Sequence, residues 1–194
     1  FSLLSCSKQD VTENQTFNLF NNDDHQIAAR CSSERFTSIF KSIEIESIRA
    51  AISSEDSEIL NEIIEKFNES IISVYHEEYG IDLATKFDND EKYGITLMGI
   101  YSAAKEKYIM DGYEVGIDEG DIPYDEIDES FDCFLTAVST AIGISDAKSL
   151  WKSIIGGAAQ QTVISSLKLM AKRVAAAWTV VVLVYEVGVC LDWW

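Results

Sequence analysis

Basic residues are scarce in this chain. Fifteen lysine and arginine side chains stand against 33 aspartate and glutamate side chains, giving a formal net charge of −18 over 194 residues. Nucleic-acid binding depends on lysine and arginine contacts to phosphates, so this charge excludes nucleic acid as a partner. It also disfavours anionic lipid surfaces and favours solubility or cationic partners.

Proline and histidine are also rare. The one proline is Pro123, so proline-rich linkers are excluded, and one domain suffices for a chain of this length. Only His25 and His76 could act as imidazole ligands, and the sequence around His76 lacks the second histidine of a zincin. We expect no metal site and no cofactor.

Catalytic signatures are missing as well. The chain has no Gly-x-Ser-x-Gly, no phosphate-binding glycine-rich loop and no dinucleotide fingerprint. Cys31 and His76, or two of the many carboxylates, could still meet in space, because the fold brings such groups together. No pair stands out in the sequence. We therefore expect no catalytic residues and a protein that is not an enzyme.

Two acidic segments begin like cation sites. Asp88-Asn89-Asp90 starts as an EF-hand loop does, but Lys92 holds the fifth position and Gly99 the twelfth, where a bidentate acid is needed. A second acidic group surrounds Pro123. We interpret it as a solvated acidic loop, with a weak cation site as the alternative.

The first ten residues hold the most specific pattern. A short apolar run ends in Leu3-Leu4-Ser5-Cys6, and a polar stretch follows. This resembles the lipobox of bacterial lipoproteins, in which a small residue precedes a cysteine that is diacylated. The resemblance implies that Cys6 carries a lipid and that residues 1–5 belong to a signal peptide. It also implies a membrane-anchored protein in the cell envelope, at the outer membrane or the cell surface.

Residues 6–25 are predicted to form a flexible tether. Their Asn, Gln, Asp, Thr and Ser content cannot bury enough apolar area to offset the entropy cost of ordering. Such a tether would hold a folded domain away from the membrane. Residues 26–194 then form an acidic helical domain.

Helical spacing of apolar residues runs through most of that domain. Ser54–Tyr79 is the clearest helix, with Asp56 near its start and Gly80 placed to end it. Further helices are predicted over Gln26–Ile52, Lys92–Met110 and Glu126–Ile142, with a short one after Ser145 and a loop over Gly112–Asp125.

The C-terminal segment Ala158–Leu191 decides the architecture. Its apolar residues keep helical spacing, although the valine-rich stretch Thr179–Val189 is also typical of a strand. A strand needs partners for its backbone groups and no second convincing strand is present, so we predict a helix. Its uninterrupted apolar run, Val174–Tyr185, has 12 residues, fewer than the roughly 20 that cross a bilayer.

These features predict an all-α fold, a single irregular helical bundle wrapped around an apolar C-terminal helix. We expect six side chains to be buried together in its core: Ile63, Phe67, Ile71, Val174, Trp178 and Val181.

Three cysteines remain if Cys6 carries a lipid, and an exported protein tends to pair two of them. We favour a disulfide between Cys133 and Cys190, which would clamp the C-terminus to the body. Pairing through Cys31, or buried free thiols, are the alternatives.

Two functions follow. The first is a membrane-anchored binding or accessory lipoprotein that contacts a protein partner and has no catalytic activity. In the alternative, Gly156-Gly157 resembles the double-glycine junction of bacteriocin precursors, and Ala158–Trp194 would be a membrane-active peptide released after Gly157.

Overall fold

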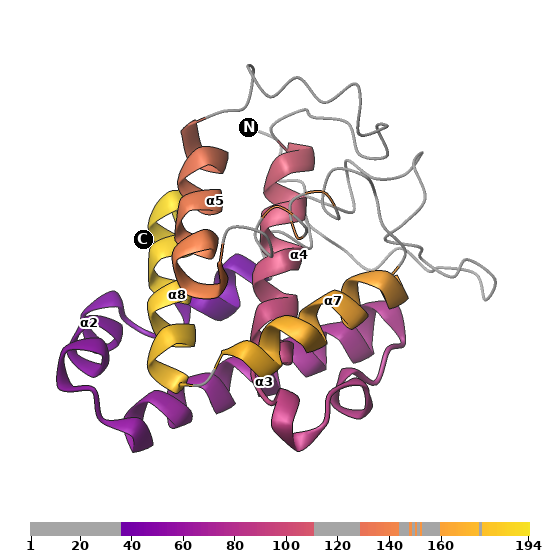
Figure 1. Ribbon diagram of the computed structural model, residues 1–194, viewed down its shortest axis with the longest axis horizontal. Helices are drawn as coiled ribbons and strands as arrows, with labels where there is room; N and C mark the ends of the chain where they lie inside the picture. The colour runs from indigo at the N-terminus through magenta and orange to yellow at the C-terminus, as the bar shows by residue number, and fades with distance from the viewer. Residues whose placement is uncertain are drawn as a thin grey trace, which may run out of the picture.

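The computed structural model describes residues 36–110, 129–143, 148, 150, 152, 160–174 and 176–194. Within these ranges the chain is helical and contains no strand, so the predicted all-α fold is confirmed (Figure 1). The α-helices with defined bounds are α2 (Ile45–Ser54), α3 (Ser57–Tyr79), α4 (Gly94–Met110), α5 (Glu129–Ile142), α7 (Gln160–Arg173) and α8 (Ala177–Cys190). A short helix over 36–41 precedes them, and the 3-10 turns η1 (Leu83–Lys86) and η2 (Asn89–Glu91) lie between α3 and α4.

Helix α3 forms where local signals place it. The Asp56 carboxylate accepts hydrogen bonds from the N–H groups of Glu58 and Ile59, which have no partner inside the helix. At the other end Gly80 adopts a left-handed conformation, with φ of 62°, and its N–H closes the last turn. Between these caps the predicted apolar stripe is buried except for Ile59, which is 44% exposed; its buried residues are Leu60, Ile63, Ile64, Phe67, Ile71 and Tyr75.

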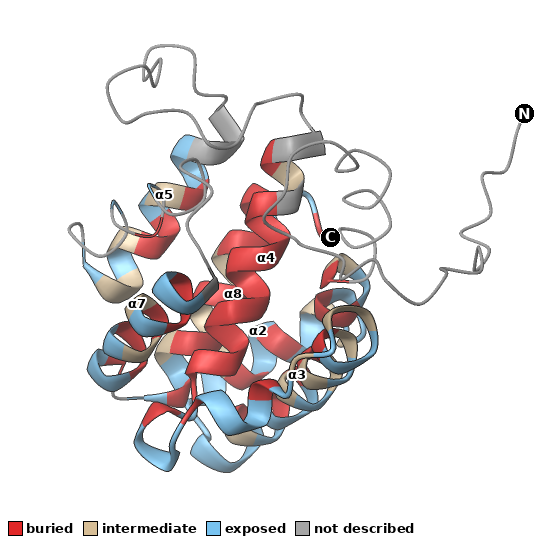
Figure 2. Ribbon diagram, turned by 90° about the vertical axis from the view of Figure 1, so that its right-hand side faces the viewer, coloured by how far each residue is buried: buried red, intermediate tan, exposed pale blue. Residues whose placement is uncertain are grey.

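Helix α8 is the centre of the bundle. It packs against α2, α3, α4 and α5, and α5 lies alongside it (Figure 1). Figure 2 shows buried residues concentrated along α8 and α4, whereas the helices around them expose their outer faces. The apolar C-terminal helix that the sequence predicts at the centre of the bundle is therefore present.

The C-terminal segment is not one continuous helix, which corrects the expectation for Ala158–Leu191. Helix α7 ends at Arg173, and Ala176 is extended, with φ of −136° and ψ of 141°. Helix α8 then starts in a new direction, so α7 crosses in front of α4 while α8 lies alongside α5 (Figure 1).

This break changes the position of Trp178. Five of the six side chains expected to share the core are buried, but Trp178 is 40% exposed, so that part of the prediction is wrong. The helical spacing that put Trp178 on the same face as Leu167 and Val174 assumed an unbroken helix. Because Ala176 is extended, the residues of α8 do not continue the helical positions of α7, and Trp178 lies at the surface.

The chain end packs back into the bundle. Trp193 is buried and stacks on Phe40, with ring centroids 4.4 Å apart. Gly188 permits this return, because a Cβ atom there would lie 2.5 Å from the Trp194 ring and 2.9 Å from the Trp193 ring.

A disulfide joins Cys133 in α5 to Cys190 at the end of α8, with a Cα–Cα distance of 5.4 Å. This is the pairing favoured from the sequence. It closes a loop of 57 residues, which stabilises a fold by about 4 kcal/mol in the chain-entropy view.

Across the parts that the structure describes, every helix is too short or too polar to cross a membrane.

Candidate functional site

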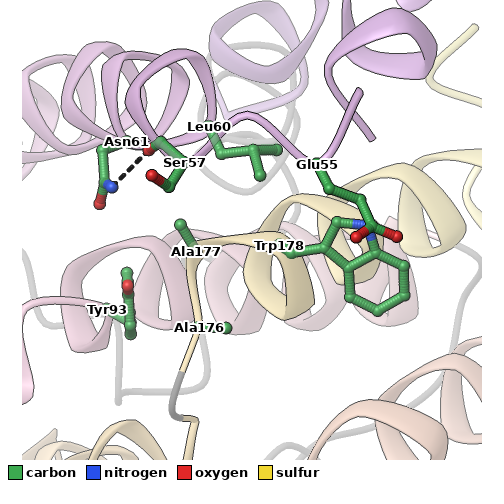
Figure 3. Close-up of a pocket in the computed structure, with 8 residues that line it drawn as sticks. All are labelled: Glu55, Ser57, Leu60, Asn61, Tyr93, Ala176, Ala177 and Trp178. Atoms are coloured by element: carbon green, nitrogen blue, oxygen red, sulfur yellow. Dashed lines mark hydrogen bonds between the residues drawn. The ribbon is translucent and has the colours of Figure 1, made fainter. Parts of the chain in front are cut away.

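A cleft of about 510 Å³ opens beside the start of α8 (Figure 3). Its walls come from the α2–α3 junction, from the first turns of α3 and α8, and from the residue preceding α4. The side chains that define it are Glu55, Ser57, Asn61, Tyr93, Ala177 and Trp178.

Trp178 presents an aromatic face to this cleft. Its Nε1–H donates a hydrogen bond to the carbonyl oxygen of Ile52, in the last turn of α2, at 3.1 Å. The indole is therefore fixed across two helices with its polar atom satisfied. The side chain remains 40% exposed and lines the cleft, so part of its aromatic surface is accessible to a ligand.

Glu55 follows directly on that last turn of α2. It is the C-cap, its N–H donates to the carbonyl oxygen of Ala51, and its φ of 54° lies in the left-handed region. A non-glycine residue there costs roughly 1–2 kcal/mol. In Figure 3 the Glu55 side chain extends from the junction toward the indole of Trp178. No lysine or arginine of the described ranges forms an ion pair with Glu55.

At the opposite end of the cleft, the lining residues Asn61 and Tyr93 both contact Lys92, which does not itself line the cleft. Lys92 Nζ donates to Asn61 Oδ1 at 3.3 Å and lies 4.8 Å from the centre of the Tyr93 ring. Asn61 in turn donates through Nδ2 to the carbonyl oxygen of Ser57, at 2.6 Å. This end is closed by its own polar contacts.

No family model, curated protein or solved structure matches this chain. Its function must therefore be argued from its own residues.

A second polar cluster lies at η2, where the sequence begins like a calcium loop. One oxygen each of Asp88, Asp90 and Glu91 lies within 4.8 Å of the others. However, the buried Glu91 carboxylate contacts Lys168 Nζ at 3.0 Å and Lys172 Nζ at 3.1 Å. These two lysines of α7 offset two of the three carboxylate charges and tie η2 to α7.

The pKa of Glu91 is lowered from its usual value near 4.5 to about 2. The main cause is the backbone N–H of Asp88, which donates to the Glu91 carboxylate, and the two lysines add to it against the opposing effect of burial. The hydrogen bond to Glu91 also raises the pKa of Lys172.

This network predicts an acid-sensitive contribution to stability. Because the folded-state pKa of Glu91 is lowered, its stabilising effect is complete above about pH 4.5 and is lost as the pH falls toward 2. Urea unfolding of the parent and of Glu91→Gln should differ most at pH 7, and the difference should shrink by pH 2.5. Glu62→Gln, which removes an exposed charge from α3, is the control. An equal difference between parent and Glu91→Gln at both pH values would contradict this.

Several residues singled out from the sequence lie outside the described ranges. They are Cys6, Cys31, Ser145, the acidic loop around Pro123, and Gly156-Gly157. His76 is exposed in the last turn of α3, and its hypothetical partner Cys31 is among the residues not described.

The cleft has no signature in the sequence. Its residues are ordinary in type and come from positions up to 123 apart in the chain. No signal in the sequence marks Glu55, because its left-handed conformation at the end of α2 is seen only in the structure.

Proposed function

We propose that this protein is a binding or accessory module that acts by contact outside the cytoplasm, held at a membrane by a lipid on Cys6. The observation that supports it best is the disulfide between Cys133 and Cys190, because such bonds persist mainly in oxidising compartments. The Leu3-Leu4-Ser5-Cys6 pattern supplies the mode of attachment. The proposed localisation is the cell envelope, at the outer membrane or the cell surface.

The folded part favours binding over chemistry. Its cleft combines a fixed aromatic face, one unpaired carboxylate and small apolar residues, which is a recognition surface. Among the described residues that line the cleft, none is a cysteine or a histidine. A ligand or protein partner held there would be presented at the membrane surface.

Lipidation is tested by removing the acceptor. Expressed behind a bacterial lipoprotein signal peptide, the parent chain should enter the detergent phase on phase separation, and Cys6→Ala should remain in the aqueous phase. Two acyl chains supply stable membrane attachment, whereas the acidic surface alone supplies none. Ser7→Ala, which leaves the cysteine in place, should behave as the parent does. Mass spectrometry of the mature N-terminus should find an acylated Cys6, and equal partitioning of parent and Cys6→Ala would refute the anchor.

The precursor alternative is less well supported. Cys190 lies within the segment that would be released, and its disulfide joins that segment to α5. Cleavage after Gly157 would therefore leave the peptide attached until the disulfide was reduced. Mass spectrometry of the native protein without reductant separates the two readings, because only cleavage adds a new N-terminus at Ala158.

A further inference from the structure

We propose that the cleft beside α8 binds a small organic ammonium ion, with the Glu55 carboxylate and the Trp178 ring face as its two contacts. This inference rests on the proposed function, since it names the ligand class of a module that acts by binding.

The indole of Trp178 is suited to bind a cation. Tryptophan has the aromatic face that attracts cations most strongly, and here the residue is 40% exposed while Nε1 is bound to the carbonyl oxygen of Ile52. Because that hydrogen bond fixes the ring, binding requires no reordering of the side chain. A ligand with a diffuse positive charge and an apolar body matches such a surface.

Glu55 supplies the opposite charge at the same place. It caps the turn of α2 that receives the Trp178 hydrogen bond, so carboxylate and indole are held by one short segment. The N-terminus of α8 carries about half a positive charge from the helix dipole, which would repel a cation. The full negative charge of Glu55 outweighs this repulsion. The partial positive charge at the N-terminus of α3 is offset by the Asp56 carboxylate, which accepts hydrogen bonds from N–H groups of the first turn. The net charge of −18 further raises the local concentration of cations.

The other end of the cleft already shows this type of contact. There the ammonium group of Lys92 lies over the Tyr93 ring and bonds to the Asn61 side-chain oxygen. The Trp178 end offers the same combination of an aromatic face and an oxygen acceptor, without a lysine or arginine of the described ranges paired to Glu55. Since Lys92 would repel a second positive charge, the ligand is a monocation and not a diamine.

Titration with choline tests the proposal, and the uncharged 3,3-dimethylbutan-1-ol serves as the analogue of the same shape. The full-length chain is labelled with ¹⁵N, and the Trp178 indole N–H signal is assigned by its loss in Trp178→Leu. Choline should shift this signal saturably, and calorimetry should give the same dissociation constant. The neutral alcohol and the diamine putrescine should bind at least about tenfold more weakly, because each lacks the matched single charge. Absence of a saturable choline shift, or equal binding of the alcohol, would overturn the proposal.

Variants separate the site from its surroundings. Trp178→Leu should weaken choline binding about 3- to 30-fold, and Glu55→Gln at least about threefold. Glu58→Gln removes the same charge one turn away without lining the cleft, so it should leave the affinity within about twofold of the parent. If Glu58→Gln weakened binding as much as Glu55→Gln, the effect would come from the general field, and the site would be wrong.

Glu55→Gly distinguishes binding from folding. Glycine is favoured at a left-handed C-cap, so the melting temperature should be unchanged or higher while choline binding falls as in Glu55→Gln. Retained binding in Glu55→Gly would overturn the role of the carboxylate. These measurements do not depend on Cys6. If Cys6 proves unmodified, the membrane anchor is wrong. Choline binding by that same chain would still support the site.

Discussion

A chain ending at Gly157 is expected to lose cooperative unfolding and to aggregate. The cut removes α7 and α8, and α8 alone buries five aliphatic side chains that are at most 1% exposed: Val180, Val181, Leu183, Val184 and Val187. Each contributes roughly 1.5–3 kcal/mol on full burial, so together they supply on the order of 10 kcal/mol. This is comparable to the whole net stability of a domain, about 5–15 kcal/mol.

Urea unfolding followed by circular dichroism measures this effect. The parent should unfold in one sharp transition, and the shortened chain should show a gradual loss of helix or none. The double variant Cys133→Ser/Cys190→Ser is the matched control, because it keeps α7 and α8 and loses only the crosslink. It should remain cooperative with a lower midpoint. A soluble shortened chain with a sharp transition would show that α7 and α8 are dispensable, and the precursor hypothesis would then gain support.

Helix α3 shows what could be predicted from the sequence. Its core stripe, its start near Asp56 and its end at Gly80 are encoded within about one turn of each position, because caps act through neighbouring backbone groups. The observed helix begins at Ser57, three residues after the predicted start. Helices α4 and α5 were also predicted from their apolar spacing, and α5 ends at Ile142 as predicted.

The break between α7 and α8 could not be predicted in this way. The sequence between Arg173 and Ala177 contains neither glycine nor proline, so no local signal ends the helix. Helix α7 packs against α4, whereas α8 packs against α2, α3, α4 and α5, and one straight helix could not make both sets of contacts. This constraint comes from tertiary packing, so the apolar spacing of Ala158–Leu191 does not predict the break between the two helices.

The cleft was missed for a related reason. Glu55 and Trp178 are brought together only when the α2–α3 junction meets the start of α8. From the sequence, Trp178 has the spacing of a core residue and Glu55 is one of 33 acidic residues. By contrast, the Cys133–Cys190 pairing could be predicted from the sequence, because a lipid on Cys6 would leave only three candidate cysteines.

Phe67→Ala and Trp178→Ala are expected to have very different costs, although both remove a large aromatic ring. Phe67 is fully buried, and its ring packs on Phe40 with centroids 5.1 Å apart. Its loss should lower the free energy of unfolding by about 3–5 kcal/mol, as large core truncations do. Trp178 is 40% exposed, so its removal sacrifices partial burial and the hydrogen bond to Ile52, together about 1–2 kcal/mol.

Urea midpoints of the two variants at pH 7 decide between a core and a surface role for Trp178. The position matters because a core tryptophan could not offer its ring to a ligand, whereas a half-exposed one can be removed while the fold survives. Trp178→Ala should retain the helical circular dichroism spectrum and a cooperative transition, which also makes it usable in binding experiments. A cost for Trp178→Ala equal to that of Phe67→Ala would place the indole in the core and remove the aromatic wall of the cleft.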